Sequence, residues 1–444
     1  MRFSPEVHEA DFPNMLRQFL SITGGAVWKQ RVKSLIRQFK QNTYLQFHLR
    51  QLHSLELAFS ELMHVFSRSG TVPKIASAEQ YRLYAFIATT TMIYQRLTPA
   101  GQKRLRGRLL GGLKDRIGLT PLQQEMTVAA HLLSRGFDVK FSDLEIGKGF
   151  DFLAQRDDIE LEVECKRVGL DLGRKITRRE TLELHKYLKK ALSPIAVNLR
   201  GGLFVRVTLP SRLSASHKQR EQISSLVGKA LRTGVGIYDQ SACQISIIDF
   251  DINTSPFMHG GPPDEAFSLR IRPYIEEKFN SRNRELFILF APMKRALVLS
   301  LESAERDAFL DHLFDELSES AKSQFTKTRP GLLCVQFIDI TNEQIQRLAA
   351  DDRGGRPQPS ALLKETSRFL DNPGRDHIHA IAYRGCGEVS KTSTRAGATA
   401  RDDILEEGHA YVIFNDRHPL VHDRRYSVFS ANPDGSPPSL IVRE

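Results

Sequence analysis

Apolar residues recur at the 3.6-residue spacing of helices through most of the first 116 residues. Leu16, Phe19 and Leu20 follow this spacing, and residues 45–57 continue it up to a Gly/Pro break at 69–73. A further helical pattern covers residues 78–96. The sequence therefore predicts a small helical domain over residues 1–117.

Residues 102–116 combine helical spacing with a high density of positive charge. Leucines alternate there with Lys103, Arg104, Arg106, Arg108, Lys114 and Arg116. A helix of this kind is suited to lie along a phosphate backbone. Its basic side chains equally fit a solvated face with the leucines turned inward. The pattern leaves both interpretations open.

A helix is predicted to begin at Thr120, which is a good N-cap, with Pro121 at the first helical position. Leu122 and Met126 belong to its apolar face, and Glu125 lies on that same face. A carboxylate there is partly desolvated, which is costly unless a partner such as a cation is close. The alternative is that Glu125 lies at the edge of the helix and reaches water.

The pattern then changes from helical spacing to the alternation of strands. Short runs at 150–154 and 160–166 are separated by the polar turn 156–158, which predicts a hairpin. In the second run, the apolar residues point one way and four charged residues point the other way: Glu160, Glu162, Glu164 and Lys166. Asp151 lies between two phenylalanines in the first run. Carboxylates on adjacent strands repel one another, and a hard divalent cation with oxygen ligands is the usual remedy.

Strand and helix patterns alternate through the rest of the chain, which predicts an α/β fold. The run 202–210 is expected to be the strand that closes the core containing the hairpin. Because 444 residues exceed one ordinary core, we expect three consecutive domains: residues 1–117, 118–301 and 302–444.

The strongest basic cluster follows the hairpin, in and just before a helix predicted over residues 177–192. Its members are Arg174, Lys175, Arg178, Arg179, Lys186, Lys189 and Lys190. The whole chain carries a net charge of +11 with a pI near 9.5. These charges favour a polyanionic partner such as nucleic acid or an anionic membrane surface.

The four cysteines lack the spacing of a disulfide framework or a zinc site, and His377 and His379 share a strand face without a zinc-binding pattern around them. No apolar run reaches the ~18 residues of a membrane span, and the first residues lack the apolar stretch of a signal peptide. We therefore expect a soluble cytoplasmic protein.

At the hairpin the sequence resembles the PD-(D/E)xK nuclease superfamily, whose fold is restriction-endonuclease-like. The family signature is an acid on one strand and an acid-x-lysine triplet on the next, and Asp151 with Glu164-Cys165-Lys166 matches it. Glu125 matches a glutamate that the family often has on the preceding helix. Gly149-Phe150 stands where the signature has a proline. The resemblance covers roughly residues 119–208.

The resemblance implies an αβββαβ core and a nuclease that depends on Mg²⁺ or Mn²⁺ and cuts DNA. It implies that Asp151 and Glu164 bind the metal, with the Cys165 carbonyl and Glu125 completing the site and Glu162 in reserve. Lys166 would position the attacking water and offset charge on the phosphate. A homodimer, and partner proteins of a defence or repair system, are compatible with such an activity.

Three alternatives remain at this point. The strand 160–166 can be an ordinary amphipathic edge strand with a solvated charged face. A nuclease fold without turnover can serve as a nucleic-acid-binding or assembly module. Finally, the metal centre can act on another phosphoester.

Overall fold

The computed structural model describes residues 7–41, 53–73, 78–115, 118–169, 171–254, 273–280, 285–291, 295–354, 358–386, 411–426, 428–429 and 441–442. The chain forms two compact units. The main unit comprises residues 1–170 and 310–444, and the inserted unit comprises residues 171–309. The main unit is therefore built from two separate stretches of chain.

The N-terminal part of the main unit is helical, as predicted. Its helices are α1 (Phe12–Thr23), α2 (Gly25–Gln41), α4 (Ser54–Ser69), α5 (Ala78–Arg96) and α6 (Pro99–Gly112). Gly70 ends α4 in the left-handed conformation that glycine adopts at little cost (φ 67°). Thr98 caps α6 by accepting a hydrogen bond from the backbone N–H of Gly101 at 3.2 Å.

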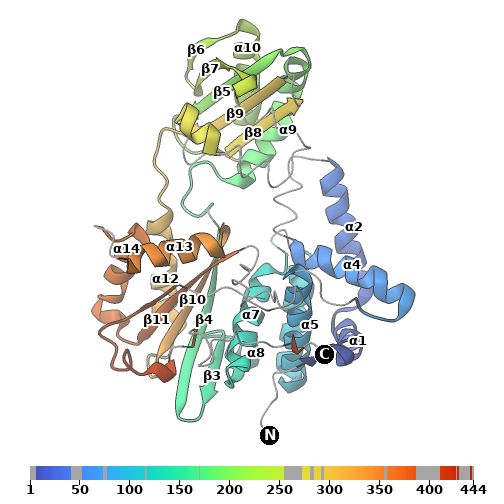
Figure 1. The fold of residues 1–444 in the computed structure, drawn as a ribbon, viewed down its shortest axis with the longest axis vertical. Helices are drawn as coiled ribbons and strands as arrows, with labels where there is room; N and C mark the ends of the chain where they lie inside the picture. Colours follow the sequence, from blue (N-terminus) through green and yellow to red (C-terminus); the bar gives the residue numbers. More distant parts are fainter. Residues whose placement is uncertain are drawn as a thin grey trace, which may run out of the picture. The chain divides into compact units, whose positions relative to one another are not determined.

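A six-stranded mixed sheet runs through the main unit (Figure 1). Its spatial order is β12 (Tyr411–Phe414), β11 (Ile378–Cys386), β10 (Gly331–Thr341), β4 (Ile159–Val168), β3 (Phe152–Arg156) and β2 (Asp138–Phe141). β2, β3 and β4 pair antiparallel, β10 runs parallel to both β4 and β11, and β12 pairs antiparallel with β11. β4 is thus an interior strand.

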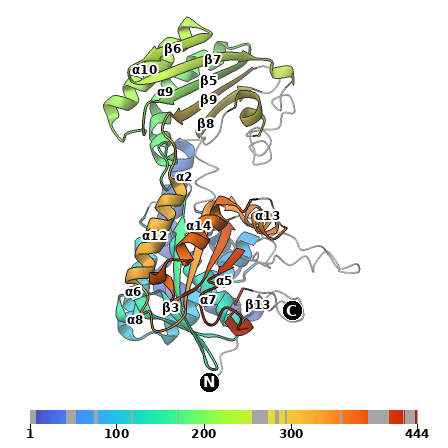
Figure 2. The same cartoon turned by 90° about the vertical axis from the view of Figure 1, so that its left-hand side faces the viewer.

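Helices cover both faces of this sheet (Figures 1 and 2). On one face lies α7 (Thr120–Ser134), followed by the N-terminal helices. Towards the other face lie α12 (Phe309–Ser323), α13 (Asn342–Arg353) and α14 (Ala361–Leu370). A short helix, α8 (Ser142–Ile146), connects β2 to β3.

A single hydrophobic core joins the N-terminal helices to the sheet. It runs from Phe19 and Trp28 through Met126 of α7 to Leu161 and Val163 of β4. Trp28 is 1% exposed, stacks on Phe59 and donates a hydrogen bond to Thr23. The described helices before α7 therefore share the core of the sheet and do not form a separate domain.

The inserted unit has a sheet and a core of its own. Its strands lie in the order β6 (Gly236–Gln240), β7 (Cys243–Phe250), β5 (Gly201–Leu209), β9 (Arg295–Ser303) and β8 (Glu285–Ala291). β5 and β9 are parallel, and the other pairs are antiparallel. The helices α9 (Arg178–Asn198) and α10 (His217–Thr233) pack on this sheet and on each other, and residues 273–279 form a further helical turn.

The strand predicted at 202–210 is real but was assigned to the wrong sheet. As β5 it pairs with β7 and β9, whereas the parallel neighbour of β4 is β10. Cys334 of β10 lies opposite Cys165 of β4, although the inserted unit separates them in sequence. The three consecutive domains expected from the sequence are replaced by one interrupted unit and one insertion.

Four 3-10 turns and a two-stranded parallel sheet complete the description. The turns are Glu9–Asp11, Ile252–Thr254, Pro373–Arg375 and Arg424–Tyr426, and the small sheet joins β1 (Val7–His8) to β13 (Ile441–Val442). Of the helices that the structure describes, none is both long and apolar enough to cross a membrane.

Candidate metal centre

The β3–β4 hairpin brings Asp151 beside Glu164 and Lys166. Phe152 lies opposite Val163, so Asp151 precedes β3 where the two strands begin to separate. The Asp151 carboxylate accepts a hydrogen bond of 2.6 Å from the backbone N–H of Cys165. The residues that the sequence singled out on two strands therefore meet at one end of the hairpin.

Helix α7 delivers Glu125 to the same place. Leu122 and Met126 are buried in the core, which holds the helix against the sheet, and Glu125 is 6% exposed. The neighbouring Gln124 donates hydrogen bonds of 2.9 Å to the carbonyls of Lys166 and Cys334. These two bonds tie α7 to β4 and β10 next to the carboxylates. Glu125 thus does not reach water at the helix edge.

Asp143, which the sequence analysis did not identify, is part of the cluster. It lies in the first turn of α8, directly after β2. Glu125, Asp143 and Asp151 each offer one oxygen, and these oxygens all lie within 4.8 Å of one another. A short helix between two strands carries no recognisable signal in one sequence, so only the fold reveals this aspartate.

Arg108 of α6 is the second residue that the sequence did not assign to the site. Its guanidinium binds Asp143 through Nη1 at 2.6 Å and binds Glu125 through Nη2. At least one cation of the basic segment 102–116, Arg108, therefore binds carboxylates within the protein. Arg104, from the same helix, donates to the backbone carbonyls of Leu144 and Glu145 at 2.6 and 2.9 Å.

Burial makes the negative charge in this cluster unfavourable. Burial raises the pKa of Glu125 to about 7, with Asp143 and Glu164 adding repulsion against the attraction of Arg108. Burial, together with Glu125 and Glu164, holds the pKa of Asp151 well above its usual value. Burial likewise raises the pKa values of Asp143 and Glu164, although Arg108 and Lys166 respectively oppose this.

Lys166 remains a cation in this environment. Burial lowers its pKa, but the attraction of Glu164, Asp151 and Glu316 outweighs burial and raises it. Its ammonium lies 2.7 Å from Glu164 Oε1, and its side chain is 27% exposed. Lys166 can therefore donate hydrogen bonds to an anionic group that enters the site.

Three carboxylate oxygens of the cluster are buried and lack a hydrogen-bond partner. They are Glu125 Oε2, Asp143 Oδ1 and Glu164 Oε2. A buried acceptor without a donor costs about 1–3 kcal/mol, and more when it is charged. The cluster is therefore electrostatically incomplete without an additional cation or proton.

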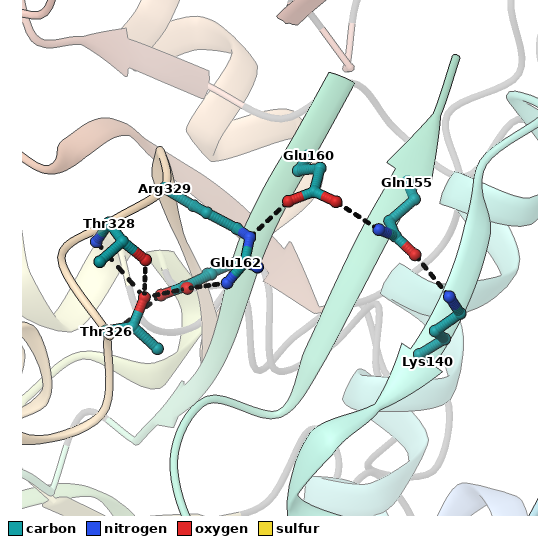
Figure 3. A network of polar contacts seen from close by, with 7 residues as sticks. All are labelled: Lys140, Gln155, Glu160, Glu162, Thr326, Thr328 and Arg329. Atoms are coloured by element: carbon teal, nitrogen blue, oxygen red, sulfur yellow. Dashed lines mark hydrogen bonds and ion pairs between the residues drawn. The ribbon is translucent and has the colours of Figure 1, made fainter. Parts of the chain in front are cut away.

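Glu160 and Glu162 have a different role from Glu164 (Figure 3). The Glu162 carboxylate is fully buried and accepts hydrogen bonds from the Thr326 backbone at 2.8 Å and from the Thr326 hydroxyl. Arg329 reaches both Glu160 and Glu162. Glu162, expected as a reserve ligand, is therefore committed to the loop between α12 and β10. The amphipathic alternative required an edge strand with a solvated charged face, whereas β4 is an interior strand on which Glu162 and Glu164 are buried.

The histidines do not form a metal centre in the described part of the chain. His377 contacts the carbonyl of Ala321 at 2.9 Å, and His379 lies 3.4 Å from His418 through their Nδ1 atoms. Burial lowers the pKa of His379 to about 4. Burial likewise lowers the pKa values of His377 and His418, so burial favours the neutral form of all three imidazoles.

The basic residues predicted to contact nucleic acid all belong to the inserted unit, and they differ in whether their side chains already have partners. Arg174 pairs with Asp171 and Asp307, Lys175 with Glu305, and Lys186 with Glu183. Arg178 is half-buried at the start of α9, where its backbone N–H bonds to Asp171. Arg179, Lys189 and Lys190 are exposed on α9. Of these residues, the exposed Arg179, Lys189 and Lys190 are best suited to bind an external anion.

In comparisons with known proteins, no family model, no characterised protein and no solved structure matches this chain.

We predict that Glu125→Gln flattens the pH dependence of stability in metal-free protein. Because the pKa of Glu125 is raised from 4.5 to about 7 on folding, the folded state binds more protons than the unfolded state between these values. Stability should therefore fall as pH rises from about 4.5 to 7, by a few kcal/mol at most for one group. Glutamine cannot ionise and removes this contribution.

Urea unfolding in EDTA at pH 5.5 and pH 8 measures this difference. The matched control is Glu61→Gln, at an exposed position of α4. If Glu125→Gln shows the same loss of stability between the two pH values as wild type and the control, the Glu125 carboxylate is not desolvated as described.

Proposed function

We propose that this protein is a divalent-metal-dependent nuclease that hydrolyses phosphodiester bonds of DNA, with a PD-(D/E)xK type of centre. The observation that carries the proposal is the convergence of Glu125, Asp143 and Asp151 beside the Glu164-x-Lys166 pair, with buried carboxylate oxygens left unpartnered. A purely structural cluster gains nothing from this arrangement, since each unpartnered acceptor lowers stability.

The order of elements around the cluster supports the proposal. α7, β2, β3 and β4 supply a helix and three antiparallel strands, and α12 and β10 supply a further helix and a strand parallel to β4. With the short helix α8 added between β2 and β3, this order is compatible with the αβββαβ core that the resemblance implies. The inserted unit interrupts it between β4 and α12.

The donors fit a hard divalent cation such as Mg²⁺ or Mn²⁺. They are carboxylate oxygens without sulfur or imidazole, which is the ligand set that these ions prefer. Glu125, Asp143 and Asp151 would hold the ion, with Glu164 and the Cys165 carbonyl at the side of β4. When bound, such an ion polarises a phosphate and lowers the pKa of its water.

The side chains of the protein contribute charge and orientation. Four carboxylates, Glu125, Asp143, Asp151 and Glu164, face the two cations Arg108 and Lys166, an excess of two negative charges when all are ionised. A divalent ion balances this excess. Lys166, kept protonated and partly exposed, would donate to a phosphate oxygen and offset the charge that develops there.

Nucleic acid is the substrate class that the charge distribution favours. The inserted unit contains 22 lysines and arginines against 15 aspartates and glutamates, so it holds +7 of the net +11 in 139 of 444 residues. Uneven positive charge of this kind is typical of surfaces that bind phosphate backbones. We infer that the inserted unit binds the substrate and the main unit carries the chemistry.

A nucleic-acid-binding module without turnover is the alternative. It would account for the charge of the inserted unit but leaves the carboxylate cluster without a purpose, because carboxylates repel phosphates. Incubation with supercoiled plasmid, single-stranded DNA and RNA, in Mg²⁺, Mn²⁺ or EDTA, separates a nuclease from this module and from an enzyme acting on another phosphoester.

Lys166→Ala should reduce DNA cleavage by about 100-fold or more, the range for losing one preorganised group that stabilises developing charge. Its affinity for DNA should fall far less than its cleavage rate, since one lysine is a small part of the basic surface. Plasmid nicking and fluorescence anisotropy measure the two effects. Lys140→Ala, an exposed lysine on β2 that contacts Gln155, is the control. Wild-type cleavage by Lys166→Ala would exclude this centre.

Mg²⁺ or Mn²⁺ should raise the melting temperature of wild type, and Asp151→Asn should lose most of this shift. A ligand that binds the folded state at a hundred times its Kd stabilises by about 2.7 kcal/mol. In EDTA, Asp151→Asn should melt at or slightly above the wild-type temperature, because one repelling charge is gone. Differential scanning fluorimetry tests both points. Equal metal-induced shifts in the two proteins would put the ion elsewhere.

Neutralising Arg179, Lys189 and Lys190 together should weaken DNA binding and reduce its salt dependence. Each phosphate contact contributes about 0.9 to the slope of log K against log salt on duplex DNA, so up to three contacts are at stake. The control replaces Arg174, whose side chain is 11% exposed and pairs with Asp307. It should affect stability and not the slope. An unchanged slope in the triple variant would remove α9 from the binding surface.

A further inference from the structure

Arg108 lies where a metal ion is proposed to bind. Its two terminal nitrogens bind Asp143 Oδ2 and Glu125 Oε1, and these two residues, with Asp151, form the convergent set of oxygens. Burial lowers the pKa of Arg108, but Glu125, Asp143 and Asp151 outweigh burial and raise it. The guanidinium is therefore the counter-ion of the same carboxylates that the ion needs.

The contact satisfies only half of each carboxylate. Arg108 uses one oxygen of Glu125 and one of Asp143, while Glu125 Oε2 and Asp143 Oδ1 are buried without a hydrogen-bond partner. Only 6% of the surface of Glu125 is exposed, so solvent does not provide the missing donor for its Oε2. A structural ion pair would be more stable if both oxygens of each carboxylate received a hydrogen bond. The two oxygens without a donor instead give an incoming cation a first point of contact.

The helix that carries Arg108 is fixed, but the Arg108 side chain is partly exposed. Arg104 binds the carbonyls of Leu144 and Glu145, and Glu145 in turn accepts a hydrogen bond from the Thr98 backbone at 2.9 Å. These bonds hold α6 against α8. The Arg108 side chain is 34% exposed, so its end can leave the carboxylates without unfolding the helix.

We propose that Arg108 is an exchangeable counter-ion, which a divalent cation displaces from Glu125 and Asp143 and which then binds a phosphate oxygen of the nucleic acid. The inference rests on the proposed function and assigns a substrate-binding role to a residue outside the signature. The planar fork of arginine binds carboxylate and phosphate with the same bidentate geometry, so one side chain serves both partners. Metal loading thereby releases a cation for the substrate.

If this exchange occurs, replacing Arg108 with an uncharged residue should change the affinities for metal and for nucleic acid in opposite directions. Removing the guanidinium removes a competitor, so the carboxylates should bind a divalent cation more tightly. It also removes a phosphate ligand, so nucleic acid should bind more weakly, but only when metal has released the arginine. A permanent structural pair would show neither the gain in metal affinity nor the metal-dependent loss of DNA affinity.

The experiment uses the full chain with Lys166→Ala as background to suppress cleavage. Isothermal titration with MnCl₂ alone should show at least about tenfold tighter binding for Arg108→Met, a shift typical of removing a charge within 4–6 Å. Binding to a duplex oligonucleotide should weaken several-fold in Mn²⁺ and stay unchanged in EDTA. Arg106→Met, at an exposed position of the same helix, should leave Mn²⁺ affinity unchanged.

Arg108→Lys keeps a charge that cannot span both carboxylates, and it tests the proposal if Arg108→Met does not fold. Arg108→Lys should bind Mn²⁺ more tightly than the Lys166→Ala protein that keeps Arg108. Thermal melting in EDTA verifies that each variant is folded. Equal or weaker Mn²⁺ binding by the folded Arg108 variants would overturn the exchange and leave the proposed nuclease centre intact. Absence of Mn²⁺ binding in every protein, wild type included, would instead remove the metal centre and the exchange with it.

Discussion

The structure around the hairpin depends on one constraint, the repulsion among carboxylates that the fold has taken out of water. Glu125, Asp143, Asp151 and Glu164 come from four different elements, and burial raises the pKa of each. No single element imposes this arrangement, so the fold must hold them together against their mutual repulsion. The tie from Gln124 to the carbonyls of Lys166 and Cys334 and the core contacts of α7 provide that force.

Strand β4 shows how differently the protein treats charges of the same kind on one strand. Glu160 and Glu162 receive Arg329 and Thr326 from a loop far away in sequence, so one guanidinium offsets part of their charge and their oxygens accept hydrogen bonds. Glu164, two residues further, has Lys166 and an oxygen without a partner. Glu160 and Glu162 thus hold the loop against the strand, whereas Glu164 keeps a buried oxygen that receives no hydrogen bond. Carboxylates two residues apart on one strand therefore differ in how far their acceptors are used.

The sequence predicted those features that depend on neighbours in the chain. Helical spacing located α7 and placed Glu125 on its apolar face without deciding whether the carboxylate reaches water, and alternation located the hairpin and therefore the meeting of Asp151 with Glu164. It could not predict that β10 lies beside β4, because strand pairing across an insertion leaves no local pattern. It also could not predict Arg108 and Asp143, since a basic helix and a short polar connection are each ordinary. The solvated strand was excluded only when β4 proved to be interior.

The inserted unit enters the chain between two strands that pair with each other, β4 and β10. The inserted unit begins three residues after β4 ends, and its entry and exit segments are joined: the Ala308 N–H donates to the Gly173 carbonyl at 3.0 Å, and Arg174 pairs with Asp307. The first and last segments of the inserted unit therefore lie side by side within that unit. In the main unit, β4 and β10 pair directly although the inserted unit separates them in sequence. The insertion, which begins at Asp171, thus keeps the pairing of β4 with β10 and the bonds from Gln124 to both strands, which support the carboxylates.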